Sequence, residues 1–414
     1  MDKARAATRT FWRAPPVLRA RRRRSTMKPA LPVTSDENNL GAPMPARCRI
    51  DLIAGTRPNI VKLGPLVHAL DQTDWCIPRV VFIQQHTAAE LSDLILEDFG
   101  IDPARLHRLA LIRTGYGERL GEMIAVYSGT LSKSAPHLVV VFGDVDVTLA
   151  ASISAKRMGL PLAHVEAGLR SHDREMPEEL NRLMVDSISD LLFATTEDAV
   201  DRLIRVEGKS AAQVHWVGNP MIDALVGTLD LESGARSARD LGLEPGKFIL
   251  ATFHRPSNVD GVEPLRHLIG ILEDACRRLP MLLPLHPRAK ASLVRHGLLV
   301  EAQSVPGLHL TEPLRYREFI NLAAHARLVL TDSGGLQEET SFLGVPCLTY
   351  RENTERPVTV TLGTNRLVGP LDTIPAIDEC LSRLMPPVPS IPLWDGHTSQ
   401  RIVKKLEAWW RCRE

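Results

Sequence analysis

Short apolar runs rich in β-branched residues alternate with longer amphipathic stretches along the chain from Cys48 onward. In the first half, the apolar runs are RIDLIAG, RVVFIQ, HLVVVFGD, LPLAHVEAG, DLLFATT and QVHWVGN. Helical periodicity occupies segments between them, for example residues 59–70 and 148–158. Strands that alternate with helices in this way predict repeated βαβ units and a parallel sheet.

A second series of the same kind begins with KFILATFHR and continues through MLLPLHP, GLHLTEP, ARLVLTDSGG and VPCLTY. The pattern therefore predicts two α/β halves of similar size, joined between Val217 and Pro245. In open parallel sheets, ligands bind beyond the carboxyl ends of the strands. The residues that follow each apolar run are thus the first candidates for chemistry.

The first 46 residues differ from the rest, because they are rich in Arg, Pro and small residues and show neither helical nor strand periodicity. We expect residues 1–46 to be a disordered basic extension. Such a segment suits a transit peptide or a nucleic-acid-binding arm, but it lacks the apolar region of a secretory signal. The favoured explanation is an over-long reading frame whose true start is Met27 or Met44.

Composition narrows the class of protein. The chain has 414 residues, of which 44% are hydrophobic and 24% charged, and its formal net charge is +1. This balance gives no global field that would recruit nucleic acid or an anionic membrane, and no apolar run approaches the length of a membrane span. Six scattered cysteines without CxxC or zinc-site spacing predict reduced thiols in a cytoplasmic protein, and no metal site.

Glycine and two cations follow the first predicted strand. The segment Gly55-Thr56-Arg57-Pro58 leads into a helix that carries Lys62. A helix N-terminus beside two cations suits a diphosphate. A salt-bridged structural arginine explains the pattern equally well.

The segment TDSGGLQEE gives a stronger signal of the same kind. Ser333, Gly334 and Gly335 would open a helix just after an apolar strand and aim backbone N–H groups at an anion. Glu339 follows about one turn later, where its carboxylate could accept hydrogen bonds from the two hydroxyls of a ribose. The structural alternative is that Ser333 only caps the helix and that the acidic residues only complement its dipole.

Two further strand ends carry cationic groups. Arg356 follows the run VPCLTY and could bind a phosphate, or it could pair with Glu352. His254 ends the first strand of the second half, beside Arg255, and could donate to a phosphate oxygen or fill a turn.

Carboxylates gather at strand ends of the first half only. Asp144 follows VVVFG, Glu166 follows LAHV, and Glu178 opens the next helix. Each has a structural explanation on its own. Together, opposite a phosphate-binding second half, they indicate general acid and base chemistry.

These segments, taken in order, resemble the non-hydrolysing UDP-N-acetylglucosamine (UDP-GlcNAc) 2-epimerases. The resemblance spans roughly residues 50–370 and rests on GTRPNIVKLGPLV, FGDVDVTLA, HVEAGLRSHDREMPEELNR, VGNPMIDAL, FHRPSNVD, LTDSGGLQEETSFLGVPCL and RENTERPVTVTLGTNRLVG. It implies two Rossmann-like domains in the glycosyltransferase-B arrangement, with the nucleotide in the interdomain cleft. The implied domains are residues 47–217, joined by a C-terminal helix at 398–412, and residues 218–397.

The resemblance also implies a role for each candidate residue. The implied catalytic residues are Asp144, Glu166, Glu178 and His254. The implied UDP-sugar ligands are Arg57, Lys62, His254, Ser333, Gly334, Gly335, Glu339 and Arg356. Gln85 and His86 lie in a segment associated with a second, activating UDP-sugar, but this chain departs from the family there, as it does at Ser257 and at Val145-Asp146-Val147.

The implied activity is the reversible conversion of UDP-GlcNAc to UDP-N-acetylmannosamine (UDP-ManNAc) by elimination and re-addition of UDP, with closure of the domains around residues 217–220. Neither a metal nor a cofactor is implied. The expected partners are a UDP-sugar and a second copy of the chain. The expected location is the cytoplasm, and the expected role is in cell-surface polysaccharide synthesis. The alternatives are the same chemistry on UDP-2,3-diacetamido-2,3-dideoxy-hexuronic acid, hydrolysis to ManNAc and UDP, and a silent UDP-sugar sensor or a transferase.

Overall fold

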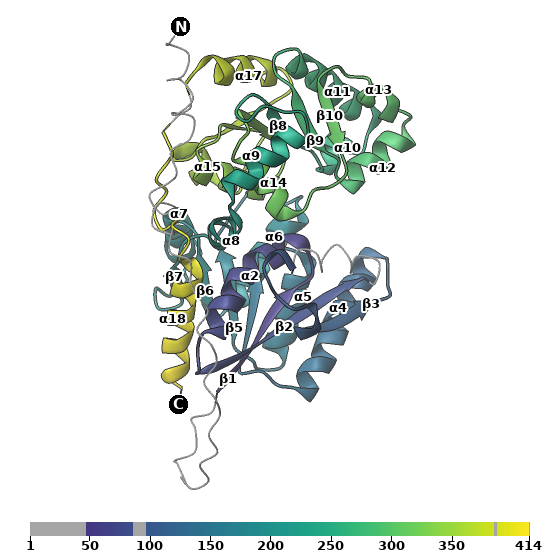
Figure 1. The fold of residues 1–414 in the computed structure, drawn as a ribbon. Coiled ribbons are helices and arrows are strands. Elements are labelled where there is room, and N and C mark those ends of the chain that lie inside the picture. The colour runs from purple at the N-terminus through teal and green to yellow at the C-terminus, as the bar shows by residue number, and fades with distance from the viewer. Residues whose placement is uncertain (1–46, 86–96, 385–386, 414) are drawn as a thin grey trace, which may run out of the picture.

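The computed structural model describes residues 47–85, 97–384 and 387–413, and it shows two parallel sheets, each wrapped by helices (Figure 1). The predicted disordered extension at 1–46 lies outside the described residues. The first sheet has the order β3-β2-β1-β4-β5-β6-β7 and the second β10-β9-β8-β11-β12-β13. Both follow the strand order of a doubly wound nucleotide-binding fold, which places a crevice where the order reverses.

Strand bounds follow the predicted runs closely. The first sheet consists of β1 (Cys48–Ala54), β2 (Cys76–Gln85), β3 (Leu106–Leu111), β4 (Leu138–Phe142), β5 (Leu162–Ala167), β6 (Leu191–Ala194) and β7 (Val214–Trp216). The second consists of β8 (Ile249–Thr252), β9 (Met281–Pro284), β10 (Leu308–Thr311), β11 (Leu328–Thr331), β12 (Cys347–Tyr350) and β13 (Asn365–Val368). The edge strands β3 and β13 were not among the predicted runs.

The helices connect successive strands and cover both sheets. In the first domain they are α2 (Arg57–Asp71), α4 (Tyr116–Lys133), α5 (Asp146–Arg157), α6 (Pro177–Ile188) and α7 (Glu197–Asp201), with a 3-10 helix at Pro103–Arg105 and a π-helix at Arg202–Val206. Then come α8 (Pro220–Thr228), α9 (Leu231–Asp240), α10 (Pro256–Val259), α11 (Val262–Cys276), α12 (Pro287–Arg295), α13 (Leu299–Gln303), α14 (Tyr316–Ala323), α15 (Gly334–Leu343), α16 (Pro357–Thr361), α17 (Thr373–Ser382) and α18 (Thr398–Arg411).

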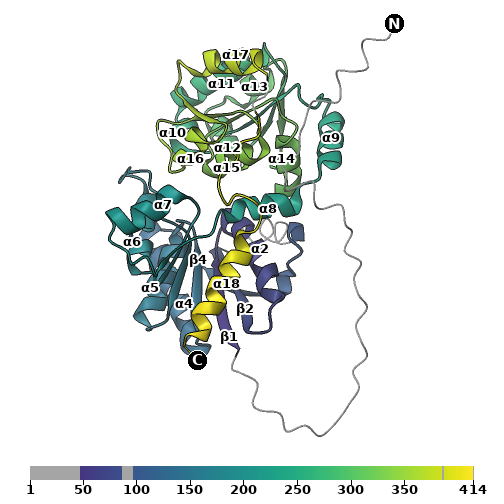
Figure 2. The same cartoon turned by 90° about the vertical axis from the view of Figure 1, so that its left-hand side faces the viewer.

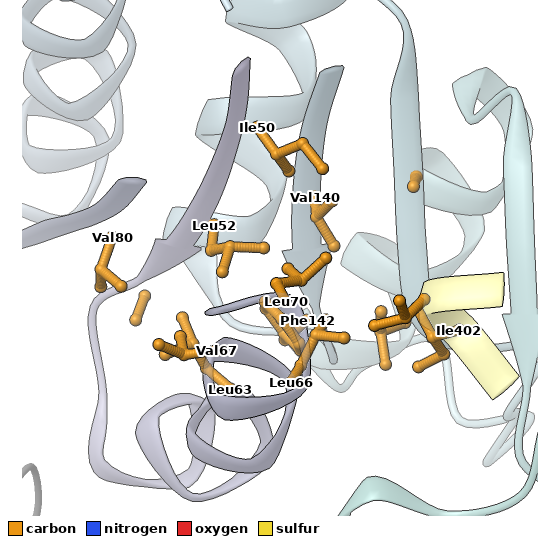
Figure 3. Close-up of a cluster of buried hydrophobic side chains, with 14 of the residues drawn as sticks. Ile50, Leu52, Leu63, Leu66, Val67, Leu70, Val80, Val140, Phe142 and Ile402 are labelled. Carbon is orange, nitrogen blue, oxygen red and sulfur yellow. The ribbon is translucent and has the colours of Figure 1, made fainter. Parts of the chain in front are cut away.

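The last helix returns to the first domain. Figure 2 shows α18 running beside α2, with which it is in contact. Its Ile402 lies among the buried side chains of the first sheet, together with Leu66 of α2 and Phe142 of β4 (Figure 3).

Helix α8 belongs to both cores. Its Met221 and Ala224 pack into the same cluster as Ile402, whereas its Ile222 and Leu225 pack into a cluster of the second domain. Because its residues are buried in both cores, α8 packs the two domains against each other.

Candidate active site

A cavity of about 480 Å³ lies between the two domains, at the carboxyl ends of their strands. Such a volume is within the usual range for sites that bind small molecules. Most of the predicted site residues line it: Lys62, Asp144, Glu178, His254, Ser333, Gly334, Gly335, Glu339 and Arg356. The side chains of Arg57 and Gln85, and all of His86, lie outside the described residues.

Glu166 is not part of the cavity lining but lies behind it, 4% exposed. Its carboxylate is hydrogen-bonded to Lys62 Nζ, and its Oε1 lies 2.9 Å from Arg356 Nη2. Burial opposes ionisation, but these two cations outweigh it and lower the pKa of Glu166. Glu166 is therefore a carboxylate that neutralises Lys62 and Arg356 from behind the cavity lining.

The backbone around Glu166 is irregular. Glu166 has φ +75°, and the pairing of β5 with β6 shifts register between Val165 and Ala167. Opposite it, Gly143 has φ +63°, and a Cβ there would lie 2.9 Å from Lys62 Nζ. A bulge and a left-handed glycine thus bring β4, β5 and α2 together closely enough for the Lys62 ion pair.

Asp144, just after β4, and Glu178, at the start of α6, both line the cavity. The Asp144 carboxylate, 25% exposed, pairs with Arg182, which is almost fully buried on α6. Arg182 is also held by Glu179 at 2.9 Å. Glu178 occupies the first turn of α6 and is half-buried in the cavity wall. Arg182 was not predicted, although its spacing of three residues from Glu179 fits a helical ion pair.

The opposite wall is the N-terminus of α15, where Ser333 is the N-cap. Gly334 is closely packed, because a Cβ there would lie 2.7 Å from both Arg356 Nη1 and Glu355 Oε1. Gly335 has open space, with only Met221 within 4 Å of such a Cβ. The first N–H groups of a helix lack partners within the helix, so this end is suited to an anion.

Glu339 lies one turn along α15, 5% exposed, and accepts a hydrogen bond from the Tyr316 hydroxyl at 2.8 Å. Burial raises its pKa to about 8, with a further contribution from the charge of Glu338. Because its pKa lies near neutral pH, Glu339 can lose its proton when hydroxyl groups of a ligand donate hydrogen bonds to it.

His254 is fixed by a buried carboxylate. Its Nδ1 lies 3.0 Å from Asp332 Oδ1, and Asp332 also accepts from the backbone N–H groups of His254 and Arg255. The ring of His286 lies 5.3 Å away, centre to centre. The Nε2 atom of His254 therefore stays available for a ligand in the cavity, and the side chain is 36% exposed.

The remaining partners of Arg356 were not predicted. Its guanidinium pairs with Glu338 at 3.1 Å and with Glu355, and Glu352 is not among its partners. Burial raises the pKa of Glu338 to about 7, whereas Arg356 and Arg351 overcome burial and lower the pKa of Glu355. The sequence suggested that Arg356 could form an ion pair with Glu352. Arg356 is indeed ion-paired, but with Glu338 and Glu355.

The described residues contain no group of three or more His, Cys, Asp or Glu side chains that could hold a metal ion. Within the same residues, no helix is both long and apolar enough to cross a bilayer.

A family model described as UDP-N-acetylglucosamine 2-epimerase matches residues 68–407. The chain belongs to the UDP-N-acetylglucosamine 2-epimerase family. A UDP-N-acetylglucosamine 2-epimerase of Methanocaldococcus jannaschii is 37% identical over 368 residues, which cover 86% of this chain and 98% of that protein. A UDP-2,3-diacetamido-2,3-dideoxy-D-glucuronate 2-epimerase of Pseudomonas aeruginosa is 37% identical over 324 residues, covering 78% and 88%.

The solved structures of this epimerase family share the fold. A crystal structure of the Methanocaldococcus jannaschii enzyme in complex with UDP-GlcNAc and UDP has a TM-score of 0.80 at 35% identity and covers 87% of this chain and 99% of that one. The predicted glycosyltransferase-B arrangement and the predicted isomerase family are confirmed. The roles of the individual site residues stay predictions.

Proposed function

We propose that the chain interconverts UDP-GlcNAc and UDP-ManNAc by eliminating UDP and adding it back. The bond from carbon 1 to the diphosphate oxygen breaks, a base takes the proton from carbon 2, and a double bond forms between carbons 1 and 2. UDP then re-forms its bond to carbon 1 while a proton is delivered to the opposite face of carbon 2. The observation that carries the proposal is that Asp144 and Glu178 line the same cavity as the N-terminus of α15 and Arg356.

Departure of UDP comes first in importance, because the proton on carbon 2 is not next to a carbonyl and is barely acidic. Positive charge at carbon 1 acidifies it. The leaving diphosphate gains negative charge, which the N–H groups at Gly334 and Gly335, His254 and Arg356 would stabilise. Glu339 would bind the ribose hydroxyls and so fix the distance from the nucleoside to this end of α15.

Inversion requires proton transfer on both faces of carbon 2. We assign these transfers to Asp144 and Glu178, because both carboxylates line the cavity. Glu166 would keep Lys62 and Arg356 in place, since it is buried behind the lining and bonded to both. Arg182 would keep the Asp144 carboxylate oriented through their ion pair.

Deuterium exchange tests this proposal. UDP-GlcNAc is incubated with the protein in D₂O and followed by proton NMR. We expect loss of the carbon 2 proton signal in UDP-GlcNAc together with growth of deuterated UDP-ManNAc. Recovery of UDP-GlcNAc without deuterium would contradict the proposal. Free UDP and free ManNAc appearing in equal amounts would instead select the hydrolysing reaction.

The same chemistry on UDP-2,3-diacetamido-2,3-dideoxy-hexuronic acid is the second candidate. It is favoured by the Pseudomonas aeruginosa relative and by Arg255, a cation of the cavity wall whose Nη2 approaches Glu355 only to 3.9 Å. A carboxylate on the sugar could pair with such a cation. Comparing kcat/KM for the two UDP-sugars distinguishes the candidates. The homodimer, the cytoplasmic location and the polysaccharide role stay predictions.

A further inference from the structure

His164 is a fully buried titratable side chain that the proposed reaction does not use. It lies on β5, two residues before Glu166, and is 0% exposed. Its Nδ1 is 2.6 Å from Asp186 Oδ1, and its Nε2 is 2.8 Å from the backbone oxygen of Gly143. Each ring nitrogen thus faces an oxygen atom.

The hydrogen-bond partners determine the protons on this ring. A carbonyl oxygen only accepts, so Nε2 carries a hydrogen towards Gly143. Asp186 also accepts from the Gly168 N–H at 3.0 Å and pairs with Arg170 at 2.7 Å. Burial opposes ionisation of Asp186, but His164 and Arg170 lower its pKa, so it too is an acceptor. Both ring nitrogens therefore face acceptor oxygens, one on the Asp186 side chain and one on the Gly143 backbone.

The two bonds of His164 meet backbone that carries the site. Gly143 precedes Asp144, has φ +63°, and donates its N–H to Val165 O at 3.0 Å. The Gly143 carbonyl, which faces His164 Nε2, belongs to the peptide group that links Gly143 to Asp144. Asp186, for its part, holds the Gly168 N–H just beyond the Glu166 bulge. The buried pair therefore ties together the segments on which Asp144 and Glu166 are carried.

We infer that His164 is a positioning residue that fixes the turn bearing Asp144 through Gly143 and ties this turn to Asp186. The inference rests on the proposed function, because it assigns His164 to the alignment of a proton-transferring carboxylate. Its substitution would change the chemical step more than nucleotide binding, since neither bond of His164 involves an expected UDP ligand and those at α15 belong to the other domain.

Two substitutions separate the two bonds. An asparagine amide can reproduce the position of Nδ1, and a glutamine amide that of Nε2. H164Q keeps a donor for Gly143, whereas H164N keeps one for Asp186. We expect kcat to fall about 100-fold in H164N and clearly less in H164Q, with KM and the Kd for UDP unchanged in both. Equal losses in the two variants, or full kcat in H164N, would overturn the inference.

His325 provides the matched control. Its Nε2 lies 2.7 Å from the backbone oxygen of Leu231 in the second domain, and it is not part of the cavity lining. H325N should lower stability without a change in kcat. Binding of UDP verifies that each variant is folded.

If the wild type itself incorporates no deuterium at carbon 2, the proposed function fails. A wild type that incorporates deuterium while H164N keeps full kcat overturns only the inference.

Discussion

Arg356 Nη2 of the second domain lies 2.9 Å from Glu166 Oε1 of the first, although 190 positions separate the two residues. Both side chains are less than 10% exposed, so the charges are partly withdrawn from water. A buried pair of this kind contributes more to specifying an arrangement than to net stability. It connects the second domain to the domain that carries Asp144, Glu166 and Glu178.

Glu166→Gln is expected to make UDP a stronger stabiliser of the protein. The substitution leaves Lys62 and Arg356 without their shared carboxylate, which should cost about 3 to 5 kcal/mol of stability. A bound diphosphate would replace the lost charge. The increase in Tm caused by saturating UDP should therefore be larger in the variant than in the wild type.

Asp51→Asn is the control for this experiment. Asp51 is 2% exposed and pairs with Arg79 at 2.7 Å, outside the cavity lining. Its loss should lower Tm without a change in the UDP effect. A UDP effect in Glu166→Gln no larger than in the wild type would show that Glu166 does not compete with the nucleotide.

Gly143→Ala should abolish turnover, whereas Gly159→Ala should not. Both glycines are left-handed, with φ +63° and +71°, so each substitution should cost roughly 1 to 2 kcal/mol of stability. Only at Gly143 would the new Cβ meet side chains, with Lys62 Nζ at 2.9 Å and Glu166 Oε2 at 3.1 Å, and nothing lies within 4 Å at Gly159. Equal activity in the two variants would contradict the tight packing of the ion pair.

The central strands were predictable because parallel strands buried on both faces form continuous apolar runs. LVVVF of β4 is buried at every position. The missed strands β3 and β13 lie at sheet edges, and the four middle residues of LHRLAL in β3 are all partly or fully exposed. The sequence of β3 therefore carries less of the apolar signal.

The site was predictable only as far as strand ends and helix starts reveal it. Asp144, Ser333 and Glu339 follow from these positions. The contact of Glu166 with Arg356 does not, because it depends on how the two domains meet, and neither does the position of Glu166 behind the cavity. Glu338 was missed because every residue of α15 from Leu336 onward is buried, which hides any periodic pattern.

Glu339→Gln should remove a pH dependence of stability. Folding raises the pKa of Glu339 from 4.5 to about 8, so its contribution to stability is full below pH 4.5 and is lost as the pH rises through 8. The glutamine has no proton to lose. Relative to the wild type, the variant should gain on the order of 4 kcal/mol between pH 4.5 and 8. Urea unfolding at the two pH values measures this, and a constant difference would contradict a raised pKa.

Asp223→Ala should loosen the C-terminal helix. Asp223 on α8 accepts from the backbone N–H groups of Thr398 at 3.0 Å and Ser399 at 2.6 Å, at the start of α18. Loss of such a cap costs about 1 to 2 kcal/mol. Hydrogen exchange in α18 should accelerate. Asp230→Ala, which removes the cap of α9, should leave exchange in α18 unchanged; similar exchange in both variants would contradict the connection.

Positional isotope exchange tests most directly whether UDP leaves carbon 1 and returns. UDP-GlcNAc is labelled with ¹⁸O in the bridge between carbon 1 and the β-phosphorus, and ³¹P NMR follows the label during turnover. We predict that ¹⁸O appears in non-bridging β-phosphate positions as fast as UDP-ManNAc forms, or faster, because the freed phosphate can rotate at the N-terminus of α15. UDP-ManNAc formed with all of its ¹⁸O still in the bridge would contradict elimination.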